Sequence, residues 1–106
     1  MIAIENENDL NVVINGNETS VVKLSAGWCN PCKVLGDTIT NIERTQPELA
    51  RFAEVDVDKA DEDFVDSLNV RSVPVLLFYK NGELKDRFNG LMTEQALIDK
   101  IEKING

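Results

Sequence analysis

The chain has 106 residues, 42% apolar and 28% charged, which predicts one folded domain over residues 1–106 and argues against disorder. Its 19 acidic residues outnumber 11 basic ones, and a net charge of −8 repels phosphate backbones and anionic lipid. We therefore expect neither nucleic-acid nor membrane partners. The chain has no histidine, which excludes Ser-His nucleophilic sites and histidine-based zinc sites.

Hydrophobic patterning predicts an alternation of strands and helices, because strands repeat every two residues and helices every three to four. The expected elements are strands at Met1–Glu5, Ser20–Ser25, Arg51–Asp58, Val73–Tyr79 and Leu84–Phe88, and helices at Asp9–Ile14, from Pro31 to before Pro47, at Ala60–Leu68 and after Thr93. Strand–helix–strand units favour parallel pairing, whereas Asn81-Gly82 predicts an antiparallel hairpin. The sequence thus predicts an α/β fold with a mixed sheet covered by helices on both faces.

The only two cysteines, Cys29 and Cys32, lie where a predicted strand leads into a predicted helix. A thiolate at the start of a helix is stabilised by unpaired N–H groups and by the helix dipole. We therefore expect Cys29 to be exposed and nucleophilic. Cys32, one turn further, is expected to be shielded and to resolve a mixed disulfide formed at Cys29.

Other uses of the cysteine pair carry less weight. A zinc site needs about four ligands, and two sulfurs without histidine do not supply them, so we expect no metal. A purely structural disulfide would close a very short loop and add little stability. Two buried cysteines without chemistry remain an alternative. Because Met1–Glu7 lacks the basic and apolar regions of a signal peptide, we expect a cytoplasmic, reducing location.

Several motifs, in the same order along the chain, closely resemble the thioredoxin family. They are Trp28-Cys29-Asn30-Pro31-Cys32-Lys33, Val73-Pro74-Val75, Lys80-Asn81-Gly82-Glu83 and Gly90. The resemblance implies a thioredoxin fold, with a mixed sheet of about five strands flanked by four helices. It also implies a monomeric protein-disulfide reductase that binds no cofactor. An NADPH-linked thioredoxin reductase would recycle it.

The resemblance assigns further residues to a substrate groove beside the cysteines. It implies that Pro74 is in the cis form and lies against the pair, although an ordinary proline opening a strand is the alternative. The backbone beside this proline would pair with an extended substrate chain, and Gly90 would leave space for it. The expected groove residues are Trp28, Asn30, Pro31, Val73, Pro74 and Gly90.

The sequence departs from the family pattern behind the cysteines. Where thioredoxins carry a buried Asp and, on the next strand, a Lys, this chain has Lys23 and Glu54. Since an isolated buried charge is costly, we expect a pair of reversed polarity. We predict that Lys23 stabilises a thiolate while Glu54 or a water takes the proton. A neutral Lys23 acting as base is one alternative, and two side chains that simply reach solvent are another.

A second departure is Asn30, which replaces the usual glycine between the cysteines. Its side chain either donates a hydrogen bond near a sulfur or is a neutral change at an exposed position. Two functional rivals remain. One is a glutaredoxin-like reductase that uses glutathione, although the Gly-Gly pair expected for it is missing. The other is a protein-binding module that uses the same groove without redox turnover.

Overall fold

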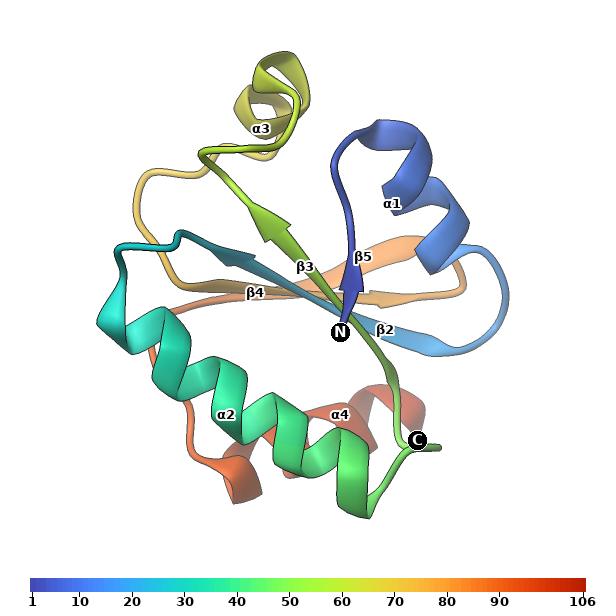
Figure 1. The fold of residues 1–106 in the computed structure, drawn as a ribbon. Coiled ribbons are helices and arrows are strands. Elements are labelled where there is room, and N and C mark those ends of the chain that lie inside the picture. The colour runs from blue at the N-terminus through green and yellow to red at the C-terminus, as the bar shows by residue number, and fades with distance from the viewer.

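The computed structural model describes residues 1–106. Five strands form one mixed sheet, with α1 and α3 on one face and α2 and α4 on the other (Figure 1). The elements are β1 (Ile2–Ala3), α1 (Glu7–Ile14), β2 (Thr19–Ser25), α2 (Asn30–Thr45), β3 (Arg51–Asp56), α3 (Glu62–Ser67), β4 (Val75–Lys80), β5 (Glu83–Asn89) and α4 (Glu94–Asn105). The predicted α/β fold and its order of elements are confirmed.

The strands lie in the order β1-β3-β2-β4-β5 across the sheet. β1, β3 and β2 are parallel, whereas β4 runs antiparallel to both β2 and β5. The turn between β4 and β5 has positive φ at Asn81 (55°) and Gly82 (78°), the backbone conformation that a two-residue hairpin turn requires. The register of β2 and β3 sets Lys23 beside Glu54.

A hydrophobic layer fills each side of the sheet. On one face, apolar side chains of α2 and α4 pack on β2, β3 and β4; they include Leu35, Ile39, Ile42, Leu97 and Ile101, all fully buried. On the other face, α1 and α3 contribute Leu10, Val13 and Phe64. β2 is buried along its whole length, so its end near Cys29 is held from both sides. None of the helices has the length and apolar character needed to cross a bilayer.

Two elements near the N-terminus begin or end at other residues than predicted. β1 covers two residues instead of the predicted Met1–Glu5, because only those two pair with β3. α1 begins at Glu7, two residues before the predicted start at Asp9. The reason is a cap: the Asn6 side chain accepts the backbone N–H of Asp9 at 2.8 Å, which satisfies a donor of the first turn.

The strands and helix that lead to the cysteine region are also shorter than predicted. β3 ends at Asp56, two residues before its predicted end. α3 begins at Glu62, because Asp61 caps it by accepting the N–H of Phe64, and it covers six residues. β4 begins at Val75 instead of Val73, since its pairing with β5 begins at Val75 and Pro74 has no N–H to donate. The segment from Asn69 to Pro74 is therefore a connection without regular structure, and it passes beside the cysteines.

Candidate active site

The two cysteines lie where β2 leads into α2. Cys29 is the N-cap of α2, and its Sγ accepts the backbone N–H of Cys32 at 3.2 Å. Pro31 lies in the first turn, where its missing N–H leaves no carbonyl unpaired. A disulfide joins the two residues, whose Cα atoms are 5.3 Å apart. The structure is thus that of an oxidised pair, with one sulfur at the positive end of a helix dipole.

Both cysteines are buried, and the predicted exposure of Cys29 is wrong for this oxidised form. Cys29 is 4% exposed and Cys32 is 1% exposed. The cover comes from Ala26, Val57 and Val73, which pack against the pair from three different segments. The predicted order of burial holds, because Cys32 is the deeper of the two.

The segment that precedes β4 lies directly against Cys29. The Val73–Pro74 peptide bond is cis, as the resemblance implies, and the Val73 carbonyl oxygen lies 3.9 Å from Cys29 Sγ. Pro74 is buried, and its carbonyl accepts the N–H of Gly90 at 2.9 Å. Gly90 has φ +106°, and a side chain there would meet no atom within 4 Å. The space beside Gly90, where β5 ends, is therefore unfilled.

Trp28 stands beside the cysteines and is 72% exposed. Its indole N–H donates to the carboxylate of Asp58 at 2.8 Å, which fixes one end of an otherwise free ring. Sequence reasoning missed Asp58, which the chain carries thirty residues away on the connection between β3 and α3. Asn30 is exposed and forms no hydrogen bond to either sulfur, which agrees with the alternative of a neutral change at an exposed position. The donor to Cys29 Sγ is the backbone N–H of Cys32.

Lys23 and Glu54 form an ion pair behind Cys32. The Lys23 side chain is 4% exposed, and its Nζ lies 2.7 Å from Glu54 Oε2. The same ammonium donates to the backbone carbonyl of Cys32 at 2.9 Å. The Glu54 side chain is 37% exposed. The alternative in which both side chains simply reach solvent is therefore wrong for Lys23, although the Glu54 side chain is partly exposed to solvent.

A small hollow connects this ion pair with solvent. It encloses about 170 Å³, and its lining includes Lys23, Ser25, Cys32, Glu54 and Asp56. A polar hollow of this size has room for water, which needs about 30 Å³ per molecule. The hollow therefore reaches from the molecular surface to the neighbourhood of Cys32.

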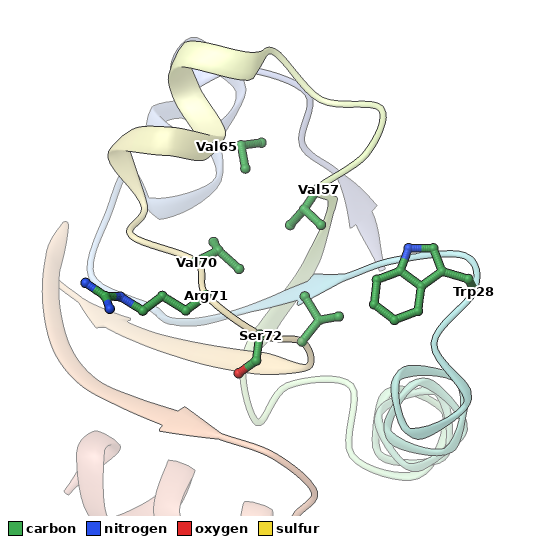
Figure 2. A pocket seen from close by; sticks show the side chains of 7 residues that line it. Trp28, Val57, Val65, Val70, Arg71 and Ser72 are labelled. Atoms are coloured by element: carbon green, nitrogen blue, oxygen red, sulfur yellow. The ribbon is translucent and has the colours of Figure 1, made fainter.

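An apolar hollow lies on the other side of the cysteines, between Trp28 and α3. We call it the valine hollow, because Figure 2 shows Val57, Val65 and Val70 directed into it, opposite Trp28; Val73 completes the lining. It encloses about 200 Å³, and Arg71 and Ser72 form its rim. The valines come from three segments: Val57 follows β3, Val65 lies in α3, and Val70 and Val73 lie in the connection before β4. No local motif could therefore have predicted the hollow. The chain contains no group of three His, Cys, Asp or Glu side chains arranged to hold a metal.

Comparison with known proteins gives the same family from sequence and from structure. The sequence model of the family described as Thioredoxin matches residues 1–103. A thioredoxin of Mycoplasmoides gallisepticum is 31% identical over 99 residues, which cover 93% of this chain and 97% of that protein.

Solved structures agree with the sequence comparison. A mutant thioredoxin from Halobacterium salinarum superposes with a TM-score of 0.88 and 28% identity, covering 99% of this chain and 90% of that one. A thioredoxin of Fasciola hepatica gives a TM-score of 0.86 at 31% identity, covering 97% of this chain and 98% of that one. The mixed sheet with two helices on each face is therefore shared with these proteins.

Proposed function

Because this chain belongs to the thioredoxin family, we propose that it reduces disulfide bonds in other proteins and that a thioredoxin reductase, supplied with electrons by NADPH, restores its dithiol. The family and the cysteine pair make the chain a thiol–disulfide oxidoreductase. The observation that carries the proposal is the hydrogen bond from the Cys32 N–H to Cys29 Sγ, since the same donor favours a thiolate after reduction.

The proposed reaction transfers two electrons in two exchange steps. The Cys29 thiolate attacks one sulfur of the substrate disulfide, forms a mixed disulfide and releases the other substrate sulfur, which takes a proton. The Cys32 thiol then loses its proton and attacks Cys29 Sγ, and the second substrate sulfur leaves and is protonated. The substrate is left as a dithiol, and the chain as the Cys29–Cys32 disulfide.

We propose that the surface formed by Val73, Pro74 and Gly90, at the ends of β4 and β5, holds the substrate chain; we call this surface the substrate edge. The Val73 carbonyl, 3.9 Å from Cys29 Sγ, is close enough to orient a substrate strand against the reacting sulfur. The unfilled space beside Gly90 gives that strand room. Trp28, Asn30 and Pro31, all exposed, would contact the substrate from the opposite side.

We propose that Lys23 and Glu54 move the proton of Cys32. The Lys23 ammonium, bonded to the Cys32 carbonyl, favours negative charge on the resolving residue. Glu54 is partly exposed and lines the hollow that reaches Cys32, so it or a water accepts the proton. Lys23 thus supplies charge and Glu54 supplies the route to solvent.

We propose that the chain acts as a single thioredoxin domain and a monomer, without a bound cofactor, in the cytoplasm. The cytoplasm is proposed because a dithiol reductase needs a source of electrons to return to its active form, and a reducing compartment provides one. The cell would supply those electrons through the reductase, and the substrates would be proteins that carry accessible disulfides.

The test is reduction of insulin disulfides with NADPH and a thioredoxin reductase, compared with NADPH, glutathione and glutathione reductase. We expect turnover in the first mixture and little in the second. Turnover only with glutathione would support a glutaredoxin-like reductase instead. Cys29→Ser and Cys32→Ser variants separate the non-redox alternative, because a binding module would keep its biological activity in both.

A further inference from the structure

We propose that a second hollow beside the substrate edge, lined by two arginines, selects substrates in which an acidic side chain lies next to an apolar one near the reactive disulfide. This inference rests on the proposed function, because it describes the substrates of the same site. It assigns the apolar side chain to the valine hollow and the carboxylate to the neighbouring hollow, which we call the arginine hollow.

The arginine hollow lies between the connection that follows α3 and the end of β5. It encloses about 310 Å³ and is lined by Asn69, Arg71, Ser72, Val75, Arg87 and Asn89. It adjoins the substrate edge directly, because Val75 pairs with Asn89 and the next residue, Gly90, bonds to Pro74. A chain held at that edge therefore passes the mouth of this hollow.

Both guanidinium groups are free of carboxylate partners, although the chain is rich in acids. None of the five ion pairs in the structure includes Arg71 or Arg87. Arg87 instead donates to the backbone carbonyls of Leu68 and Asn69 at 2.8 and 2.9 Å, which hold its side chain in place. Arg71 is exposed and forms no hydrogen bond within the chain. Two positive charges thus line one hollow without neutralisation.

The two hollows are neighbours, since Arg71 and Ser72 contribute to the lining of both. Figure 2 shows the Arg71 side chain directed away from Trp28, so the apolar lining and the cation lie at opposite ends of the surface. An extended chain crossing Ser72 would meet valines on one side and guanidinium groups on the other. Arginine binds carboxylates with paired hydrogen bonds, and this geometry favours an acidic partner over a neutral or basic one.

The experiment uses three disulfide-bonded peptides that differ at one position. Each carries valine next to one cysteine, and the residue before that valine is Glu, Gln or Lys. The reduced protein is mixed with each peptide, samples are quenched with acid, and the second-order rate constant of reduction is measured. The wild-type protein should reduce the Glu peptide fastest and the Lys peptide slowest.

The variants test which side chain is responsible. Arg71→Gln should lower the rate for the Glu peptide about three- to fivefold, the range of an exposed ion pair, and change the Gln peptide less than about twofold. Arg71→Glu should reverse the preference in favour of the Lys peptide. Lys80→Gln removes one positive charge at the far end of β4 and should leave the order of the three peptides unchanged.

Equal rates for the Glu and Gln peptides in wild type and Arg71→Gln would overturn the inference, as would an Arg71→Glu variant with no gain toward lysine. Failure of the proposed function looks different, because then none of the three peptides is reduced. The unfolding midpoint of each variant shows whether it is folded. If Arg71→Gln does not fold, Arg71→Lys, which keeps the charge, must retain the preference for glutamate.

Discussion

The ammonium of Lys23 donates a hydrogen bond to the backbone carbonyl of Cys32 across 2.9 Å. It thereby joins a buried cation to the first turn of the helix that carries the resolving cysteine. The negative partner is Glu54, 2.7 Å from the same ammonium and partly open to solvent. The pair is thus asymmetric: the cation is fixed beside the redox pair, and the anion lies on the route to water.

Replacing Lys23 with methionine should change the pH dependence of disulfide reduction. Methionine has a side chain of similar length but lacks the cation beside Cys32. The resolving thiol is therefore harder to deprotonate in the variant. We expect reduction at pH 7 to be slower by about tenfold or more, because a nearby positive charge favours an anionic group by roughly one to three powers of ten. Rates measured from pH 5 to 9 give the profile. Lys80→Met is the control, and a Lys23→Met profile that matches it would contradict the assignment.

Gly36→Ala tests whether the absence of a side chain in α2 gives the Lys23 ammonium its place. A Cβ at this position would lie 3.0 Å from Lys23 Nζ, which two partners already hold. Alanine normally stabilises a helix interior by about 0.5–1 kcal/mol relative to glycine. We expect that gain to be lost in the wild-type background and to return in Lys23→Met. Urea unfolding measures the free energy of unfolding of four oxidised proteins: wild type, Gly36→Ala, Lys23→Met and the double variant. An equal gain from alanine in both backgrounds would contradict the contact.

Asp58→Ala should loosen the Trp28 ring and weaken substrate binding. The substitution removes the only hydrogen-bond acceptor of the indole, which is otherwise 72% exposed. Because Trp28 is the only tryptophan, its fluorescence anisotropy reports the change directly, and we expect it to fall. KM for protein substrates should rise about two- to fivefold, the effect of one lost hydrogen bond, with kcat unchanged. Asp37→Ala, an exposed acid on α2, should alter neither quantity.

Tyr79→Phe should remove part of the loss of stability at high pH. Burial raises the pKa of Tyr79 above its usual 10.0 in the folded protein, although the positive charge of Arg87 opposes the shift. A raised pKa means that the fold favours the neutral phenol. The contribution to stability is therefore complete below pH 10.0 and is lost as the pH rises through the folded pKa.

The measurement compares urea unfolding of wild type and Tyr79→Phe between neutral and strongly alkaline pH. Wild type should lose more stability than the variant over that range, because only it must ionise the phenol on unfolding. Tyr79 is the only tyrosine, so phenolate absorbance follows the same group without a second signal. Stability curves that stay parallel throughout would show that the phenol has the same pKa in both states.

The core of this fold could be predicted from hydrophobic periodicity alone. Leu35, Ile39 and Ile42 repeat at helical spacing, and all three are fully buried against the sheet. Element ends were less predictable, because they depend on caps such as Asn6 and on which residues find a partner strand. Each cap is a single side chain that competes with several similar ones nearby.

The site was predictable in its chemistry but not in its contacts. Spacing identified Cys29 and Cys32, yet Cys29 is buried because Val57 and Val73 arrive from distant segments. The cis form of Pro74 could be inferred only from the family resemblance, since the two forms of such a bond differ by only about 0.5–1 kcal/mol in a flexible chain. The partnership of Trp28 with Asp58 has no signature in the sequence.

The most direct test of the central claim is to trap the intermediate with a Cys32→Ser variant. This variant keeps Cys29 at the start of α2 but lacks the sulfur that resolves the mixed disulfide. After reaction with a disulfide substrate, peptide mapping by mass spectrometry should find the substrate bonded to Cys29, and dithiothreitol should release it. A Cys29 that remains free, while wild type still reduces the same substrate, would contradict attack by this sulfur.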